Sequence, residues 1–546
     1  MALFSPDVRP LLMFISPLGV RPSRANLLAL AESVGGAIVL CGLAFALQHR
    51  YGFGWADEGL LWYDSQRTSL GGIPIRDYYG YDPGRYYWVS IFFHLLGNDG
   101  LYELLIANAV FGAVGLAAVW FGMCASGMRV GWRLTAAVML AIALGYPRHK
   151  VYEQSLSLIL TAIVFFALAK PVDMKRWLIF GTLTGLAAVI GRNSGVYFVG
   201  GAMLSGLLLV LTQSPGPRAK PAVMYALGVV LGYSPMLALL AFAPGLWTAF
   251  LQSVLFLPHW QLPLPIPFVW RVDIDGLGLI DATQQVAVGM ACVFVPIFYV
   301  GALAGVTVIR RRTATWSTQM MMTASACIAG LAFLYQSFDR ADFGHIANGF
   351  LPAFVAVNSG ATLLLDTWKK RLPAIALTSG FTIMMAACWL PYEPAVVFAR
   401  ARHADPHSVA DVRIDGKTFE VYAYQAETLR TVSETAERCG VHGLGFLAAP
   451  HFPGVYAYLH AKAPFWEMYY LYPRPIEFQK KHVTAIVNTR LILLAPDATI
   501  DGLEHLKLKN TYGELMKDIE ARYEPLDVPL PSGFRLYALP GACGLR

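Results

Sequence analysis

The sequence predicts a multi-pass helical membrane protein with an α/β domain at its C-terminal end, and three observations carry this prediction. Hydrophobic residues make up 56% of the 546 residues and charged residues only 14%, whereas a soluble protein has roughly 25% charged residues. Apolar runs of about twenty residues, long enough to cross ~30 Å of hydrocarbon, recur along the chain. From about residue 393 onward, charged residues return at ordinary density.

About eleven segments have the length and composition of membrane spans. The first apolar run continues into aromatic and acidic residues without a small-residue cleavage site, so we interpret it as a retained helix and not as a signal peptide. The third, fourth and fifth segments are short or interrupted, which is typical of broken helices. The predicted spans lie near residues 26–48, 101–126, 134–150, 152–170, 177–193, 195–212, 221–243, 286–309, 318–337, 345–366 and 373–391.

Basic residues occur in short clusters between these runs, and with eleven spans every cluster falls on the same side. The positive-inside rule makes that side cytoplasmic, so we predict a bacterial plasma-membrane protein whose other face is extracytoplasmic. The clustering also indicates no nucleic-acid partner, despite a net charge of +7. The clusters are Arg9, Arg21 and Arg24; Arg129 and Arg133; Lys170, Lys175 and Arg176; Arg218 and Lys220; 310–312; and 369–371.

The composition predicts two domains. A membrane domain covers residues 1–392 and includes an extracytoplasmic loop at 49–100, and an extracytoplasmic α/β domain covers 393–546. No Gly-rich phosphate loop follows the first predicted strand, so a nucleotide site is not expected. In the tail, strands are predicted at 419–424, 443–447, 483–487, 491–494 and 534–539, and helices at 426–438 and 512–522.

Seven cysteines do not form a metal-binding pattern. Five lie singly within apolar runs and are expected to be small core residues. Cys439 and Cys543 lie in the polar tail, where they could pair in an oxidising compartment.

An acidic pair, Asp57 and Glu58, follows the first predicted span. Acids next to a bilayer are costly and usually serve chemistry or transport. Neighbouring residues on a helix point about 100° apart, so only one of the two can face a given site squarely. Two interpretations remain. In one, Asp57 is a general base and Glu58 supports it; in the other, both are solvated and cap the next helix.

A second polar segment, Asp82-Pro83-Gly84-Arg85, lies among tyrosines and tryptophans. Pro and Gly favour a tight turn with an acid before it and a cation after it. The aromatic residues suit either a sugar-stacking surface or a membrane-interface belt. We predict that Asp82 and Arg85 bind substrate, and the alternative is an ordinary turn.

Cations also gather on the face that the positive-inside rule depletes. Arg340, Asp342 and His345 would orient together if their segment turns like a helix, and Arg is suited to phosphate oxygens. The alternatives are a short charged hairpin and, for single arginines, snorkelling to the interface. The other candidates for binding an anionic lipid-linked substrate are Arg148, His149, Lys150 and Arg192.

Together, the acidic pair in the first external loop, the many spans, the cationic external junctions and the trailing domain resemble the GT-C fold of polyprenyl-phosphate-sugar glycosyltransferases. The similarity is to the protein O-mannosyltransferase and aminoarabinose-transferase group and covers the whole topology. The segment 453–464 is similar to the extracytoplasmic parts of such enzymes. The resemblance implies that Asp57 matches the catalytic acid of the first loop and that the 340–345 segment handles lipid phosphate.

We therefore predict a membrane glycosyltransferase that moves a sugar from a polyprenyl-phosphate donor to a hydroxyl of a glycan, lipid or protein acceptor. A base takes the acceptor proton, cations hold the departing phosphate, and a single attack inverts the anomeric centre. A divalent cation would have Asp57, Glu58 and Asp82 as oxygen ligands, and the sequence requires none. The alternatives are a transporter or flippase of lipid-linked glycans, and a ligase or polymerase that uses a diphosphate-linked donor.

Overall fold

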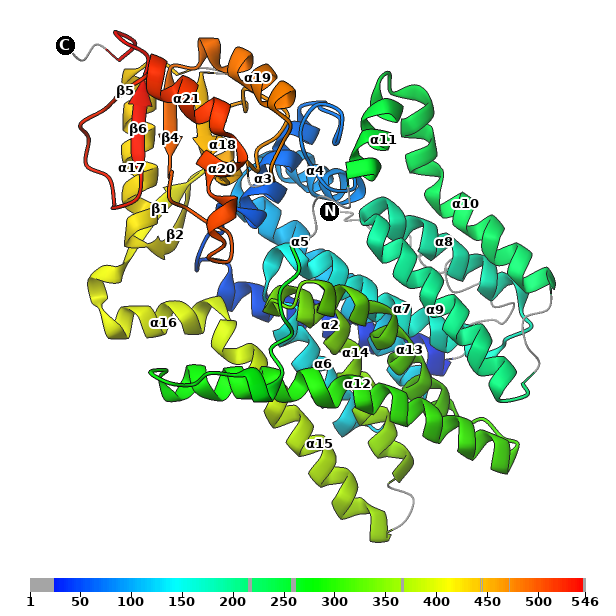
Figure 1. Cartoon of the computed structure of the whole chain (residues 1–546). Helices are drawn as coiled ribbons and strands as arrows, with labels where there is room; N and C mark the ends of the chain where they lie inside the picture. Colours follow the sequence, from blue (N-terminus) through cyan, green and yellow to red (C-terminus); the bar gives the residue numbers. More distant parts are fainter. Residues whose placement is uncertain are drawn as a thin grey trace, which may run out of the picture. The chain divides into compact units, whose positions relative to one another are not determined.

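The computed structural model describes residues 24–214, 219–256, 262–364, 368–441, 443, 445–470 and 472–543. Within these ranges nine helices are long and apolar enough to cross a membrane, so the predicted multi-pass helical architecture is confirmed. The chain forms two compact units (Figure 1). Unit 1 comprises Met1–Ala46, Ala109–Leu237 and Pro263–Tyr392, and unit 2 comprises Leu47–Asn108, Ala238–Leu262 and Glu393–Arg546.

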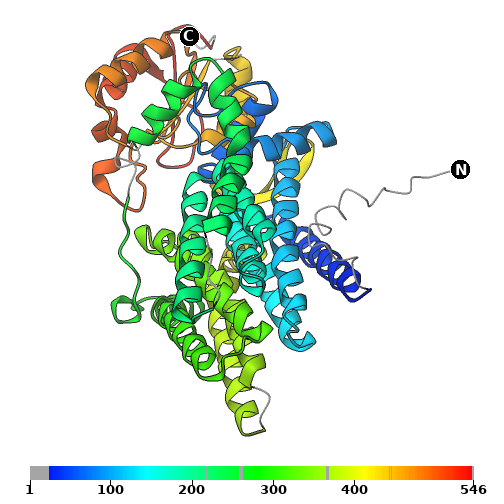
Figure 2. The ribbon, with the colours of Figure 1, turned by 90° about the vertical axis from the view of Figure 1, so that its right-hand side faces the viewer.

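The membrane helices lie mostly in unit 1. Helices α7, α13 and α14 pack against one another, and their spans are the most buried; Figure 2 shows this bundle from the side. The helices are α2 (Arg24–Gln48), α5 (Leu101–Ala125), α6 (Val130–Ala143), α7 (Val151–Ala169), α8 (Met174–Ile190), α9 (Arg192–Leu211), α10 (Ala219–Phe242), α12 (Leu279–Thr313), α13 (Thr318–Asp339), α14 (Phe343–Leu364) and α15 (Trp368–Trp389).

Each predicted span coincides with one of these helices, but two helices are short. Helix α6 has 14 residues and α8 has 17, fewer than the ~20 that a membrane crossing requires. The prediction ran the third span to residue 150. Helix α6 instead ends at Ala143, because Pro147 cannot donate a backbone hydrogen bond within a helix. A separate 3-10 helix, η2 (Arg148–Lys150), follows.

Helices α8 and α10 approach each other at glycines. A Cβ on Gly181 would lie 2.0 Å from the carbonyl oxygen of Tyr225, and a Cβ on Gly228 would lie 2.2 Å from that of Leu178. Small residues four positions apart let membrane helices come this close. Gly185 and Gly232 continue the two stripes one turn further along, with contacts equally close to backbone atoms.

Unit 2 contains three helices from the loops, α3 (Asp57–Ser69), α4 (Gly84–Leu96) and α11 (Leu246–Phe256), together with the tail. The predicted α/β character of the tail is confirmed. Its elements are α16 (Pro394–Ala404), β1 (Val409–Ile414), β2 (Lys417–Tyr422), α17 (Ala423–Arg438), β3 (Phe446–Ala449), α18 (Pro453–Tyr458), α19 (Ile476–Ala485), β4 (Leu491–Leu494), α20 (Leu508–Thr511), α21 (Gly513–Arg522), β5 (Glu524–Pro525) and β6 (Arg535–Ala538).

The tail's larger sheet has the strand order β3-β4-β6-β5, in which β3 and β4 are parallel and the other pairs antiparallel. Strand β4 is buried along its whole length, as its uninterrupted apolar sequence predicts. Strands β1 and β2 form a separate hairpin, not fully predicted, whose turn residues Asp415 and Gly416 both have positive φ. This geometry is that of a type I′ turn, for which Asp-Gly is a preferred sequence.

One predicted strand is wrong. Residues 483–487 lie in α19 and the following 3-10 helix η7 (Ile486–Asn488), not in a strand. Gln479 and His482, three positions apart, are both buried on the helix, and α19 packs against α21. A short apolar run does not by itself distinguish a strand from a buried helix face.

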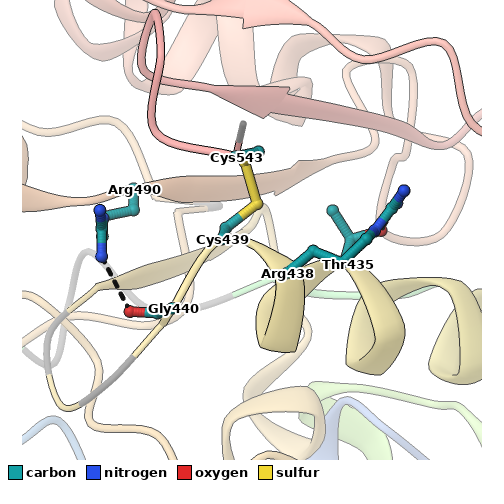
Figure 3. The surroundings of a disulfide bond; sticks show 6 residues. All are labelled: Thr435, Arg438, Cys439, Gly440, Arg490 and Cys543. Carbon is teal, nitrogen blue, oxygen red and sulfur yellow. Dashed lines mark hydrogen bonds between the residues drawn. A yellow bond between two sulfur atoms is a disulfide. The ribbon is translucent and has the colours of Figure 1, made fainter. Parts of the chain in front are cut away.

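Cys439 and Cys543 form a disulfide across 104 positions of the chain. Figure 3 shows the bond joining the residue after α17 to the segment after β6, next to a hydrogen bond from Arg490 to the carbonyl of Gly440 at 3.1 Å. Cys439 is 1% exposed. The bond therefore ties the end of the last strand to the end of the tail's long helix.

Candidate functional site

Asp57 and Glu58 are the first two residues of α3, where the helix dipole favours acidic side chains. Asp57 is exposed, whereas Glu58 is 4% exposed. The Oε2 atom of Glu58 accepts a hydrogen bond from the backbone N–H of Gly54 at 3.0 Å. The two neighbouring carboxylates thus differ in surroundings: Asp57 is reachable from outside, and Glu58 closes the turn that leads into the helix.

The first turn of α3 is seated directly on the backbone of α18. A Cβ on Gly59 would lie 2.5 Å from the backbone nitrogen of Gly454, so no other residue fits there without displacement. The N–H of Gly454 donates to the carbonyl of Trp55 at 2.9 Å. This contact fixes where the Asp57 turn lies on the tail.

A tyrosine from the tail holds Asp57. The hydroxyl of Tyr469 donates to Oδ1 of Asp57 at 2.8 Å, and Tyr469 is 5% exposed. Its ring lies 5.8 Å from that of Tyr79, which packs edge-on against Trp466 at 5.4 Å. Burial, together with the nearby charge of Asp57, raises the pKa of Tyr469 well above its usual range. Tyr469 is therefore a neutral hydrogen-bond donor at physiological pH.

A histidine also lies near Asp57. Burial lowers the pKa of His451, and the negative charge of Asp57 opposes that shift only in part. The imidazole stacks on Phe452 at 5.0 Å. His451 is thus neutral near neutral pH, as expected for an imidazole whose desolvation outweighs its attraction to a carboxylate.

The predicted Asp82–Arg85 turn leads directly into α4, whose N-cap is Pro83. Asp82 and Arg85 are each 7% exposed, and the guanidinium carbon of Arg85 lies 5.4 Å from the ring centroid of Tyr81. Tyr81 is 39% exposed and its ring lies 6.3 Å from that of Tyr79. An exposed aromatic ring therefore stands over a buried cation within the aromatic cluster that surrounds Tyr469.

A second acid on α3 has the opposite surroundings to Asp57. Asp64 is fully buried, and burial raises its pKa well above the usual range although a hydrogen bond with Tyr86 lowers it. The hydroxyl of Tyr86 in turn accepts from the N–H of Tyr81 at 2.7 Å. Asp64 thus supports the 78–86 segment and is not accessible to a substrate.

In unit 1, the structure brings together Arg340, Asp342 and His345, although the backbone of Arg340 is extended and the segment does not turn like a helix from 340 onward. Nε of Arg340 donates to Oδ2 of Asp342 at 2.8 Å, and Nδ1 of His345 lies 2.9 Å from the same carboxylate. Nζ of Lys150 lies 3.4 Å from Nε2 of His345. Burial opposes ionisation of Asp342, but hydrogen bonds and charge from His345 and the charge of Arg340 together hold its pKa well below its usual range.

The backbone on both sides of this cluster is ordered by neighbouring segments. Arg340 is the C-cap of α13, and it forms an isolated parallel β-bridge with Leu264. Leu264 lies in a proline-rich stretch, residues 262–267, that is not helical. Phe343 stacks on Tyr392 at 4.1 Å.

The remaining candidates also begin helices. Arg148 and His149 precede Lys150 in η2, and Arg192 is the first residue of α9, separated from α8 by the extended Gly191. All these cations belong to unit 1, whereas Asp57, Glu58, Asp82 and Arg85 belong to unit 2.

Among the described residues, no three His, Cys, Asp or Glu side chains are grouped so as to hold a metal ion. The sequence analysis did not identify Tyr469 or His451. Tyr469 lies 412 positions from Asp57, and neither residue belongs to a recognisable motif.

No protein-family model and no curated protein match the chain. Among solved structures, it is similar to the Archaeoglobus fulgidus oligosaccharyltransferase tethered with an acceptor peptide, at 11% identity and a TM-score of 0.48 over 93% of this chain and 74% of that one. It is also similar to ArnT from Cupriavidus metallidurans in the apo state, at 13% identity and a TM-score of 0.47 over 94% and 98%. At these identities the function has to be argued from this chain's own residues.

Proposed function

We propose that the chain is an integral-membrane glycosyltransferase that moves a sugar from a polyprenyl-phosphate donor to a hydroxyl group of a glycan, lipid or protein. The observation that carries the proposal is the exposed Asp57 carboxylate, which stands at the start of α3 and is held by the buried, neutral hydroxyl of Tyr469. The sequence resemblance to GT-C glycosyltransferases assigns the catalytic acid to the same residue.

In the proposed reaction Asp57 removes the proton of the acceptor hydroxyl as its oxygen attacks the anomeric carbon of the sugar. The bond between that carbon and the phosphate oxygen breaks, and polyprenyl phosphate leaves with the bonding electrons. One displacement inverts the anomeric centre. A positioned base contributes roughly 10²–10⁴ to such a rate, and Asp57 suits the role because its carboxylate is exposed and is held by the hydroxyl of Tyr469.

The departing phosphate requires positive charge. In the 340–345 cluster, Arg340 and Lys150 bring two cations close together, with Asp342 bonded to Arg340 and His345 next to Lys150. Arg340 is 24% exposed on its side chain, and its planar guanidinium is well matched to phosphate oxygens. We therefore assign the lipid-phosphate contact to this cluster, with Arg148, His149 and Arg192 as further candidates.

The same proposal places the tail, residues 393–546, on the extracytoplasmic side of a bacterial plasma membrane. Two observations support it. The basic clusters between spans share one side under the predicted topology, and the tail contains the Cys439–Cys543 disulfide, a bond that persists in oxidising compartments.

An in vitro transfer experiment tests the function. The purified protein in lipid nanodiscs is given a panel of undecaprenyl-phosphate hexoses and pentoses with a cell-envelope extract as acceptor, and free undecaprenyl phosphate is measured by mass spectrometry. We expect undecaprenyl phosphate to be released from at least one of the sugar donors, at a rate that depends on the acceptor extract. Release only from diphosphate-linked donors would instead support the ligase alternative. Movement of intact donor across a vesicle bilayer without release would support the flippase alternative.

Topology is tested separately by cysteine labelling of intact cells with a membrane-impermeant maleimide. His407 is exposed, next to Ser408 in the tail, and Arg371 is exposed at the predicted cytoplasmic start of α15. We expect His407→Cys to be labelled and Arg371→Cys to be labelled only after the membrane is permeabilised. The reverse pattern would contradict the proposed orientation.

A further inference from the structure

The segment 463–474, called the strap here, runs from α18 towards α19 and carries Tyr469. In addition to the hydrogen bond from Tyr469 to Asp57, the strap makes hydrogen bonds with the first-loop segment that use at least one backbone atom each. The N–H of Ala463 donates to the hydroxyl of Tyr63 at 2.9 Å, and the N–H of Tyr79 donates to the carbonyl of Trp466 at 2.7 Å. The indole N–H of Trp466 donates to the carbonyl of Ile75 at 2.7 Å. The strap is thus bonded along its length to the region that contains Asp57.

The other side of the strap is bonded to the core of the tail. The N–H of Tyr470 donates to the carbonyl of Pro450 at 3.0 Å, and the carbonyl of Tyr470 accepts from the hydroxyl of Thr511 at 2.5 Å. Tyr470 itself is fully buried in the tail's hydrophobic core. Both bonds involve the residue directly after Tyr469, so the backbone on that side of Tyr469 is fixed.

A buried ion pair closes the strap on itself. Arg474 donates two hydrogen bonds to the carboxylate of Glu467, at 2.8 and 2.7 Å, and the hydroxyl of Tyr512 donates to the same carboxylate. Glu467 is 0% exposed. A buried carboxylate is tolerated only when it is bonded this fully, so the ion pair holds Glu467 and Arg474 together.

We propose that Tyr469 is a positioning residue that orients the Asp57 carboxylate for proton removal, an inference that rests on the proposed function. Its hydroxyl donates to Oδ1 of Asp57 from a buried ring, which restricts the rotation of the carboxylate relative to α3. Because Tyr469 stays protonated, its hydroxyl remains a donor that stabilises the negative charge of Asp57. The tail therefore completes the catalytic constellation and is not an accessory domain.

Tyr469→Phe removes one hydroxyl and keeps the ring that packs on Tyr79. With the donor and acceptor identified from the panel above, we expect kcat to fall roughly ten- to a hundredfold, the effect of one hydrogen bond to a charged group, while the KM for donor changes less than about twofold. The matched control is Tyr523→Phe. Its buried hydroxyl donates to the carbonyl of Ile486 at 2.7 Å in the same unit, away from Asp57. It should lower the melting temperature and leave kcat unchanged.

An unchanged kcat in Tyr469→Phe, or a raised KM at constant kcat, would overturn the positioning role. A second experiment tests the contact between Tyr469 and Asp57 without an activity assay. It compares the melting temperatures of Asp57→Ala, Tyr469→Phe and the double variant. Residues in contact give non-additive effects, so we expect the double variant to lose less than the sum; additivity would overturn the contact. A wild type that releases no polyprenyl phosphate from any donor, together with a non-additive cycle, would instead overturn the proposed function and leave the contact standing.

Discussion

The two carboxylates at the candidate sites, Asp57 in unit 2 and Asp342 in unit 1, are held in opposite ways. Asp57 accepts a hydrogen bond from the neutral hydroxyl of Tyr469 and lies near the neutral His451, whereas Asp342 is bonded to Arg340 and to His345, which in turn contacts Lys150. A neutral hydroxyl that donates to a carboxylate adds no positive charge beside it, whereas the arginine beside Asp342 forms an ion pair with that acid. The comparison shows that the neighbouring side chains determine which role an aspartate can have.

The largest expected effect is at Asp57. Asp57→Asn keeps the size and much of the hydrogen bonding but cannot accept a proton, so we expect transfer to fall by ~10²–10⁴ with insertion, folding and donor binding retained. Glu58→Gln should be milder, because a glutamine oxygen can still accept from the N–H of Gly54. Both variants are measured by release of undecaprenyl phosphate. Near-normal turnover in Asp57→Asn would mean that the acid has no role as a base, and equal losses in both would point to a shared metal ion.

Next in size is the effect at Arg340. Arg340→Ala removes a charge-assisted phosphate contact, which is worth roughly 1.5–3 kcal/mol of donor affinity, and should slow chemistry less at saturating donor. The control is Arg271→Ala, an exposed arginine of the same unit that packs on Phe268. Binding of an undecaprenyl-phosphate sugar is measured in nanodiscs. Unchanged donor affinity in Arg340→Ala would mean that the 340–345 segment has only a structural role.

A smaller effect, visible mainly in its pH dependence, is expected at His451. Because burial lowers its pKa, the unfolded chain binds a proton more readily, so the stability it contributes is present above about pH 6.5 and declines as the pH falls. Between pH 8 and pH 5.5, the melting temperature of His451→Gln should therefore fall less than that of the wild type. Turnover of the variant at pH 7.5 should change by less than ~10-fold.

His460 provides a control of opposite sign. A hydrogen bond to Asp415 raises its pKa, so the stability that His460 contributes is present at low pH and declines as the pH rises through its folded value. His460→Gln should consequently lose more melting temperature at pH 5.5 than at pH 8. The same pH trend in both histidine variants would contradict the assignment of a neutral imidazole beside Asp57.

The smallest effect is expected at Asp64, on the same helix as Asp57. Because its pKa is raised, the stability it contributes is full below about pH 4, the unfolded value, and declines as the pH rises towards the folded value. Asn resembles the protonated acid, so Asp64→Asn should melt at the same or a higher temperature than the wild type, with the difference growing from pH 4 to pH 8. A large loss of stability at pH 7 would show that the ionised form is required.

Sequence analysis located what is encoded locally. The spans follow from continuous apolar runs. Sequence analysis also singled out Arg340, Asp342 and His345 by their short spacing, although the structure groups them across an extended residue and a helix start and not along one helix. It did not locate Tyr469, because pairing across 412 positions depends on how the strap folds back. Nor did it identify α4 as a helix, since Pro83 and Gly84 signal a turn and also suit a helix start.

The glycine contact between α8 and α10 has a consequence for biosynthesis. Helix α8 has 17 residues, and its Gly181 and Gly185 face backbone atoms of residues 225–233. Attraction between membrane helices comes from such close packing and not from exclusion of water. The ribosome delivers α8 well before α10, so α8, although α7 is already present to pack against it, enters the bilayer before its glycine contact has a partner. A ribosome stalled soon after α8 has emerged would hold a short helix without its glycine contact, and lengthening the nascent chain past residue 233 would allow it to dock.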